Sequence, residues 1–402
     1  SSLLAPPHGS VGRKALCDTC EKAQPALSPS PLFAMIAAPP AGGRCGTSLH
    51  YIKPNTLLHS CAVSDELLEW DLASGERRAV LRKWGINRAE ISPDGTLLCL
   101  ATQFGLAMYR FPVEVDAPLW YARADIAFCE AKFSRDGRLI ATVQDGAGRP
   151  AVPDDRWSSS PTDRASDASR GLLEIRDAQS GALVKEVTEF AACADNHGTR
   201  ALGGGLSFSQ GLLAATGRGR KGWRCSGEAA VRLLSIESDF QVVKRLTLPD
   251  VRASDDAPFT YLNDDGKNIT ATAFDPAGKR LAVGAFNRTR FTELRASDVF
   301  VWSEEGDDWS SPPLQLGNAG QGGKVVEFLG FSHSGRLLCV AYMGPGPLLW
   351  DVETGSCVCD FKQACSAFAF SPADDALALA GFDGHVTAER IEKPSSHLCC
   401  IC

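Results

Sequence analysis

Dense apolar runs recur along the chain, and each follows a short turn sequence. In the stretch "FSHSGRLLCVAY", which starts at Phe331, a turn ending in Gly335 leads into an almost uninterrupted apolar run. Continuous runs of this kind are typical of strands covered on both faces, whereas a sheet with one solvated face gives alternation. A Gly/Pro turn and a second apolar run, ending at Trp350-Asp351, follow directly. The stretch therefore predicts two neighbouring antiparallel strands.

The same unit occurs seven times. Its other turns read "YIKPN", "ISPDG", "FSRDG", "FSQG", "FDPAG" and "FSPAD", and they start at Tyr51, Ile91, Phe133, Phe208, Phe274 and Phe370. Consecutive starting residues lie 40, 42, 75, 66, 57 and 39 positions apart. A basal period near 40 corresponds to four short strands per repeat, which is the size of a propeller blade. The pattern predicts an all-β fold, a single closed β-propeller with seven four-stranded blades.

Several units end in a Trp, an Asp or both. Trp70-Asp71 and Trp350-Asp351 carry the full pair, each with its Trp 19 residues after the start of its turn, while Arg176-Asp177 keeps the Asp and Trp302-Ser303 keeps the Trp. Together with the turn glycine and the apolar strand, this resembles the WD-repeat β-propeller family, over roughly residues 47–391. The Gly-His dipeptides that typify regular members are absent ahead of the first strands, so the chain resembles a divergent relative. Trp70, Trp302 and Trp350 are expected in the core.

The ends of the repeat region predict how the ring closes. After Ile391 the sequence "EKPSSHLCCIC" is too polar to supply the outer strand of the last blade. The apolar segment "PLFAMIAA", residues 31–38, precedes the first unit at the place where an outer strand should lie. We therefore expect a disordered tail at 1–30, a propeller at 31–391 whose last blade is completed by the N-terminal strand, and a Cys-rich tail at 392–402.

Three of the repeats are longer than the basal period. Their extra residues lie between the second and third strands, at 146–170, 217–229 and 286–298, and also between blades, at 191–204, 250–268 and 318–324. In a four-stranded antiparallel blade these two kinds of connection emerge at the same end of the ring. We call this end the insertion face. Residues 146–170, which are rich in Ser, Asp and Arg, are expected to be disordered.

The insertions differ in charge from the rest of the chain. Residues 217–229 contain four basic residues against Glu228, a net charge of +3 in a chain of net charge -7. Arginine beside aromatic rings suits an acidic or phosphorylated partner, because guanidinium binds carboxylate or phosphate in a bidentate manner. A solvated loop without a partner is the alternative interpretation. The candidate partner-binding residues are Arg218, Arg220, Lys221, Trp223 and Arg224, together with Arg288, Arg290, Phe291 and Arg295 from residues 286–298.

Composition narrows the classes of function. The negative net charge argues against nucleic-acid binding. The 15 cysteines are odd in number and scattered, which favours a reducing compartment, hence a cytoplasmic or nuclear location. No apolar run is long enough to cross a bilayer, and no secretory signal is evident. The terminal cysteines leave two alternatives to an unmodified tail, a zinc site shared with Cys17 and Cys20 or lipidation near Cys399, and only lipidation would favour a membrane partner.

No catalytic motif is recognisable. The sequence has no G-x-S-x-G elbow, no phosphate-binding G-x-x-x-x-G-K-[ST] and no H-E-x-x-H, and we expect no catalytic residue, cofactor or metal. The family resemblance implies a non-catalytic scaffold, a monomeric propeller that joins a larger complex through a protein partner. Two alternatives stay open: a propeller that binds phosphoinositides at a membrane surface, although the Phe/Leu-Arg-Arg-Gly motif of such members is missing, and a propeller hydrolase.

Overall fold

A computed structural model describes sixteen stretches of the chain, and all of them belong to one compact unit, Ala34–Cys402. The described residues are 48–61, 66–83, 86–102, 104–123, 128–144, 173–187, 191–192, 205–218, 230–248, 267–287, 298–306, 308–316, 326–342, 344, 346–381 and 384–391.

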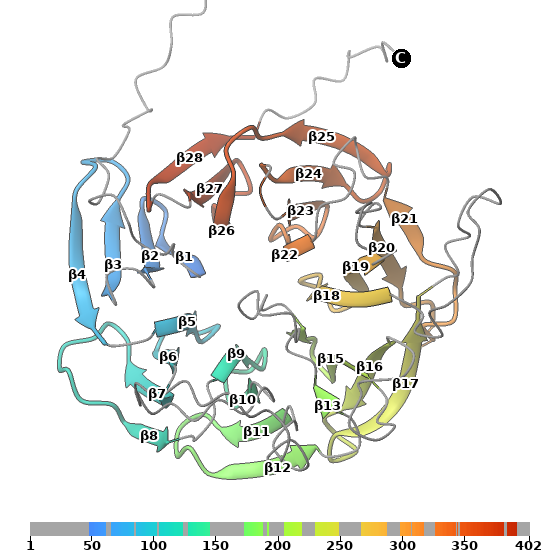
Figure 1. Ribbon diagram of the computed structural model, residues 1–402, viewed down its shortest axis with the longest axis horizontal. Coiled ribbons are helices and arrows are strands. Elements are labelled where there is room, and N and C mark those ends of the chain that lie inside the picture. The colour runs from blue at the N-terminus through green and yellow to red at the C-terminus, as the bar shows by residue number, and fades with distance from the viewer. Residues whose placement is uncertain are drawn as a thin grey trace, which may run out of the picture. The chain divides into compact units, whose positions relative to one another are not determined.

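These residues form seven antiparallel sheets arranged around a central axis (Figure 1). Blade 1 contains β1 (Ser48–Lys53), β2 (Thr56–Cys61), β3 (Glu66–Asp71) and β4 (Arg77–Arg82). Blade 2 contains β5 (Ile86–Ile91), β6 (Leu97–Thr102), β7 (Gly105–Arg110) and β8 (Trp120–Arg123). Blade 3 contains β9 (Phe128–Phe133), β10 (Leu139–Gln144), β11 (Leu173–Asp177) and β12 (Leu183–Val187). The prediction of a seven-bladed, all-β propeller is confirmed.

The remaining blades follow in the same order. Blade 4 contains β13 (Ala191–Ala192), β14 (Leu206–Phe208), β15 (Leu212–Arg218), β16 (Ala230–Ser235) and β17 (Gln241–Thr247). Blade 5 contains β18 (Lys267–Phe274), β19 (Arg280–Asn287), β20 (Asp298–Ser303) and β21 (Leu314–Leu316). Blade 6 contains β22 (Val326–Phe331), β23 (Leu337–Tyr342), β24 (Leu348–Asp351) and β25 (Ser356–Asp360), and blade 7 contains β26 (Cys365–Phe370), β27 (Ala376–Gly381) and β28 (Val386–Arg390).

Blade 4 departs from the expected order at its innermost position. Both β13 and β14 pair with β15: Ala191 and Ala192 lie opposite Arg218 and Gly217, and Leu206–Phe208 lie opposite 213–215. The sequence placed all of 191–204 between blades, and this was wrong for its first two residues. The innermost strand is therefore split, and the insertion begins within it.

Blade 7 has three strands among the described residues, and β28 is the outermost of them. The fourth, outer position is the one that the sequence assigns to residues 31–38. Those residues lie outside the described part of the chain, as do the two predicted tails and the insertion at 146–170. Closure of the ring by the N-terminal strand stays a prediction.

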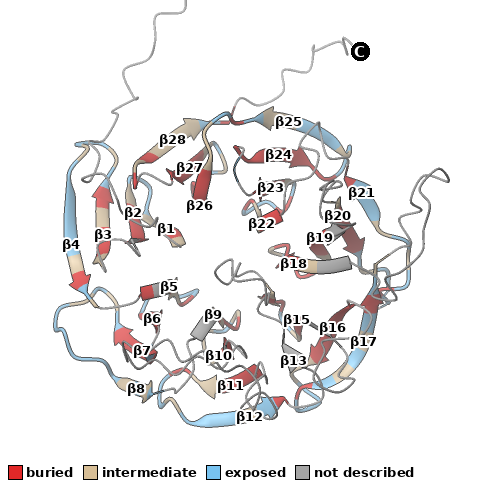
Figure 2. Ribbon diagram, in the orientation of Figure 1, coloured by how far each residue is buried: buried red, intermediate tan, exposed pale blue. Residues whose placement is uncertain are grey.

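The hydrophobic core lies between neighbouring blades rather than inside any single sheet. One cluster joins Leu57 and Trp70 of blade 1 to Ala378 and Ala380 of blade 7. Inner strands are buried on both sides, as in β6, whereas outer strands such as β4 are mostly exposed (Figure 2). The burial of both faces explains the continuous apolar runs of the second strands. The three expected core tryptophans are buried, with exposed fractions of 0% for Trp70, 4% for Trp302 and 5% for Trp350.

The recurring turn connects the first and second strands of a blade and has one backbone requirement. Gly95, Gly137, Gly278 and Gly335 occupy the same turn position with φ between 70° and 75°, a left-handed conformation that glycine adopts without a steric cost. In each turn the glycine N–H donates to the carbonyl of the residue three positions earlier. These turns lie at the end of the ring opposite the insertion face, and we call that end the turn face.

Candidate functional site

The residues predicted to bind a partner fall mostly outside the described part of the chain. Arg218 is the last residue of β15, and its backbone pairs with Ala191. Arg220, Lys221, Trp223 and Arg224 follow it in 219–229, which the structure does not describe. The same holds for Arg288, Arg290, Phe291 and Arg295. The structure therefore places the start of the first basic segment on a strand and leaves the role of these side chains as a prediction.

The strands that carry the basic segments are longer than their counterparts. β15 has seven residues and β19 has eight, whereas β2, β6, β10, β23 and β27 have six each. The ladder between β18 and β19 continues to the pair Lys267–Asn287, and the ladder between β15 and β16 continues to Gly217–Ala230. The sheets of blades 4 and 5 thus extend at their insertion-face ends, and the two segments start from hydrogen-bonded strand ends.

A concave feature of the structure lies on the axis of the ring. A cavity of about 400 Å³ is lined by residues from the innermost strand of every blade, which are β1, β5, β9, β14, β18, β22 and β26. This volume falls within the range of small-molecule sites in proteins. The wall is chemically uneven, because charged side chains come from blades 2 and 3 and aromatic or small ones from blades 6 and 7. We call this feature the central cavity.

A chain of three ionisable side chains crosses blades 1, 2 and 3 at the central cavity. Lys132 Nζ donates to Glu90 Oε2 at 2.9 Å, and His50 Nε2 lies 3.9 Å from the same carboxylate oxygen. His50 Nε2 also lies 2.8 Å from the carbonyl oxygen of Ala89, to which it can donate. Burial lowers the pKa of His50, against the opposing effect of Glu90. At neutral pH the chain therefore combines a neutral imidazole with one satisfied Lys–Glu pair.

Arg88 forms the next part of the charged wall. Its guanidinium lies over the ring of Phe328 from blade 6, with 5.2 Å between the guanidinium carbon and the ring centroid. Burial raises the pKa of Glu327, beside Phe328, to about 7, and the charge of Arg88 acts in the opposite direction. Arg88 thus joins blade 2 to blade 6 through an aromatic ring and a partly compensated carboxyl group.

Glu130 is the most deeply buried carboxylate of the cavity wall, with an exposed fraction of 3%. Its Oε2 accepts a hydrogen bond of 2.9 Å from the backbone N–H of Gly205 in blade 4. Its Oε1 is also buried and has no hydrogen-bond partner within the described stretches. Buried carboxylate oxygens are nearly always paired, because desolvation of a charge is costly. This oxygen is the unsatisfied polar atom of the central cavity.

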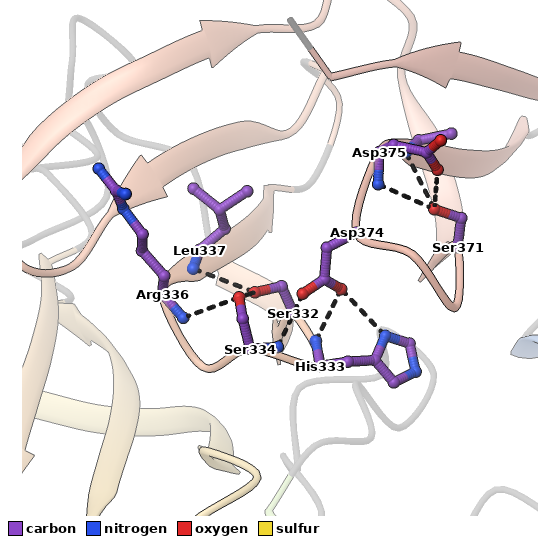
Figure 3. A network of polar contacts seen from close by, with 9 residues as sticks. Ser332, His333, Ser334, Arg336, Leu337, Ser371, Asp374 and Asp375 are labelled. Carbon is purple, nitrogen blue, oxygen red and sulfur yellow. Dashed lines mark hydrogen bonds and ion pairs between the residues drawn. The ribbon is translucent and has the colours of Figure 1, made fainter. Parts of the chain in front are cut away.

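His333 lines the cavity on the turn-face side, where it contacts blade 7 (Figure 3). Asp374 accepts hydrogen bonds from the backbone N–H groups of His333 and Ser334, at 2.8 and 2.7 Å, and lies 3.0 Å from His333 Nδ1. Ser332 Oγ accepts the backbone N–H of Leu337 at 3.1 Å and is fully buried. The Ser, His and Asp of this network therefore close turns and join two blades, and the serine hydroxyl is not aimed at the imidazole.

The sequence could have indicated the charged side of the cavity. His50, Glu90 and Lys132 each directly precede the first residue of a turn, namely Tyr51, Ile91 and Phe133. Alignment of the repeats on these turns places the three side chains at one level of the ring. The signal was missed because each residue taken alone is only a polar position in an inner strand.

The described residues offer no candidate for two other classes of site. No group of three or more His, Cys, Asp or Glu side chains in these stretches could hold a metal ion, and no helix there could span a bilayer. The cysteines of the predicted zinc or lipid sites, Cys17, Cys20 and Cys399, lie outside the described stretches.

Comparisons with known proteins establish the fold and not the family. No protein-family model and no curated protein matches the chain. Among solved structures, hydrazine synthase from Kuenenia stuttgartiensis is similar with a TM-score of 0.59 and 13% sequence identity, over 87% of this chain and 97% of that one. At this identity the likeness is one of fold alone. Because 1529 solved chains match in total, the fold does not select one function.

Proposed function

We propose that this propeller is a non-catalytic, WD-repeat-like interaction scaffold that docks an acidic or phosphorylated protein partner on its insertion face. The observation that carries the proposal is the position of the insertions. Residues between the second and third strands of blades 3, 4 and 5 are lengthened, so three neighbouring blades bring their additional residues to one end of the ring. Additional residues on one face of a repeat scaffold are typical of a binding surface.

The extension of β15 and β19 supports the same face. Two of the three insertions are basic, and they follow β15 and β19, strands of seven and eight residues where the other second strands have six. A hydrogen-bonded strand end fixes the backbone from which a segment continues, which lowers the entropy cost of ordering that segment against a partner. Arg218 is the first basic residue beyond the regular ladder length.

The turn face contrasts with the insertion face. Its turns are short and four of them share one glycine-dependent geometry, and their polar side chains are used in contacts within and between turns, as in the network of Asp374. Groups committed to such contacts are costly to recruit for a partner. The insertion face is therefore the better candidate for docking.

The test is affinity purification from the native cell combined with mass spectrometry. The variant changes Arg218, Arg220, Lys221 and Arg224 to Glu. A matched control reverses four exposed basic residues of the turn face, Lys53, Arg110, Lys279 and Arg390, so that the net charge of the two variants is the same. We expect an acidic or phosphorylated partner to be lost from the first variant and kept by the control, with the melting temperatures of both close to wild type.

Three outcomes would contradict the proposal. Equal loss from both variants would indicate a non-specific charge effect. Retention of every partner by the first variant would remove the basic segment from the interface. Binding of the wild-type chain to vesicles containing phosphoinositides, lost in the same variant, would favour the membrane alternative instead.

A further inference from the structure

The central cavity has two chemically different sides. Blades 2 and 3 supply Arg88, Glu90, Glu130 and Lys132, and blades 6 and 7 supply Phe328, Phe331, Phe368 and Phe370 together with Gly330 and Ala369. A cavity of about 400 Å³ with an ionic wall and an aromatic wall suits a small amphipathic molecule. The charge arrangement on the ionic wall then decides which kind of polar group such a molecule should carry.

The two cations of the wall are already compensated. Lys132 donates to Glu90 at 2.9 Å. Arg88 lies over Phe328 and interacts electrostatically with Glu327. An anionic ligand would have to compete with these existing partners, and it would meet two further carboxylates. The wall therefore does not favour an anion.

Glu130 is in the opposite situation. One oxygen is fixed by the backbone N–H of Gly205, at 2.9 Å, while the other is buried at the cavity wall without a hydrogen-bond donor in the described stretches. A Cβ at Gly205 would overlap Thr216 Oγ1, so glycine is required at this position beside Thr216. The backbone of blade 4 thus holds the Glu130 carboxyl group in place, with one oxygen unsatisfied. A donor group that also carries positive charge would form the missing hydrogen bond and offset the desolvation cost of the Glu130 carboxyl group.

We propose that the central cavity binds a small organic ammonium ion, whose N–H donates to the Glu130 carboxylate after its buried Oε1 turns toward the cavity, and whose apolar stem packs against the aromatic wall of blades 6 and 7. The aromatic rings favour this orientation, because the apolar stem gains contact with them. A metal ion is the less suitable cation, since the described residues offer no group of three ligating side chains here. This inference is independent of the proposed docking function.

Calorimetric titration of the full chain with n-butylammonium tests the proposal, with butanoate and n-butanol as probes of inverted and absent charge. We expect saturable binding of n-butylammonium with a dissociation constant of about 1 mM or tighter, and at least about tenfold weaker binding of the other two probes. Glu130→Gln keeps the size of the side chain and should weaken binding of n-butylammonium by at least about tenfold. Glu186→Gln, on the exposed outer strand of the same blade, is the matched control and should bind as wild type does.

A second variant keeps the test decisive if Glu130→Gln does not fold. Ala369→Leu adds volume at the blade 7 wall without touching Glu130, and it should weaken binding of n-butylammonium through lost space. A further calorimetric titration with a short lysine-containing peptide identifies the source of the cation. If the peptide binds more tightly than n-butylammonium and Glu130→Gln weakens its binding, the ammonium group belongs to a protein side chain. If n-butylammonium binds more tightly than the peptide, the ligand is a free amine.

Two results would overturn the inference. One is the absence of saturable binding of either cation to the wild-type chain at concentrations up to about 10 mM. The other is equal affinity of wild type and of folded Glu130→Gln and Ala369→Leu variants, which would place the cation elsewhere. Neither result affects the insertion face, because none of these substitutions lies on the segments changed in the docking experiment.

Discussion

Asp374 anchors His333 across the boundary between the last two blades. Its carboxylate accepts the backbone N–H groups of His333 and Ser334 and lies beside His333 Nδ1 (Figure 3). Asp374 also occupies the turn position that glycine holds in blades 2, 3, 5 and 6, and it does so with φ of 55°. Aspartate is one of the few residues with a Cβ that tolerates this left-handed conformation. The backbone strain at Asp374 is thus combined with a contact between blades.

Substitution of Asp374 separates these two effects. Asp374→Gly removes the carboxylate without backbone strain and should lower the free energy of unfolding by about 2 kcal/mol, because two N–H groups lose a charged acceptor. Asp374→Ala should cost about 1 kcal/mol more than Asp374→Gly, since alanine is strained at positive φ. Urea denaturation measures both values. Equal stability of the two variants would mean that the turn relaxes to another conformation.

The same carboxylate gives a dependence on pH. Burial acts to raise the pKa of Asp374, but hydrogen bonds from Ser334 and His333 outweigh it, so the pKa lies below its ordinary value. The stabilisation is therefore complete above the unfolded-state pKa near 3.8 and is lost as the pH falls below it. Unfolding of wild type and Asp374→Gly between neutral pH and pH 3 should give stabilities that converge at the acid end. A constant difference would contradict the role of the ionised carboxylate.

Trp350 is predicted to contribute through packing alone. It is 5% exposed in the core between blades 5 and 6, and its Nε1 has no hydrogen-bond partner within the described stretches. Trp350→Ala should lower the free energy of unfolding by about 3 to 5 kcal/mol, while Trp350→Phe should cost less, because it keeps an aromatic ring and loses no hydrogen bond. Chemical denaturation of both variants makes the comparison. A Phe variant as unstable as the Ala variant would indicate that the indole N–H does have a partner.

His59 should make the ring sensitive to acid. It is fully buried on β2, neither ring nitrogen has a hydrogen-bond partner among the described residues, and burial lowers its pKa to about 4. The unfolded chain binds the proton more readily than the folded one between the two pKa values. Stability is therefore present above pH 6.5 and is lost as the pH falls towards 4, by about 3 kcal/mol in total.

The matched variant for this prediction is His59→Leu. It removes the titrating group and two unsatisfied nitrogens, and it puts an apolar side chain of similar size in their place. We expect it to be at least as stable as wild type at pH 8 and to show a smaller loss of stability on acidification to pH 5. Parallel acid profiles for the two proteins would exclude His59 as the source of acid sensitivity.

The outer edge of blade 7 gives a prediction about the N-terminal segment. β28 is the outermost described strand of that sheet, and a fourth position beside it is expected for residues 31–38. Deletion of residues 1–46 should lower the melting temperature and expose a strand edge that promotes association, whereas deletion of residues 1–25 should do neither. Thermal unfolding and size-exclusion chromatography of the two truncated chains provide the measurement. Equal stability of both would show that the ring closes without this segment.

The fold was predictable from the sequence because its signal repeats. The turns at Ile91, Phe133 and Phe331 start apolar runs that each became a second strand, and the register of Trp70 and Trp350 placed both in the core. The split strand of blade 4 was not predictable, since Ala191–Ala192 and Leu206–Phe208 are too short to show any period. Their assignment depends on pairing with β15, which is a tertiary contact.

The central cavity was harder to predict than the blades. Glu90 and Lys132 are 42 positions apart in the sequence and meet only because two inner strands lie side by side. The approach of Gly205 to Glu130 depends on the split strand, which the sequence did not reveal. Alignment of the repeats would have given the level of the charged residues. The unsatisfied oxygen of Glu130 depends on tertiary packing, which the repeat pattern does not determine.

The shortened turn of blade 4 changes how the ring is coupled. In this turn the Ser209 N–H donates to the carbonyl oxygen of Leu212. The equivalent hydrogen bond in blade 3 runs from the Ser134 N–H to the carbonyl oxygen of Leu139, so the turn of blade 4 is two residues shorter. Arg135 of blade 3 can therefore donate to the carbonyl oxygen of Asp275 in blade 5, at 2.7 Å. In most repeat proteins stability is a sum over single repeats and adjacent pairs. Here the Arg135 contact links blades 3 and 5, which are not adjacent, so blades 3, 4 and 5 should unfold as one cooperative segment even if blade 4 alone is weakened.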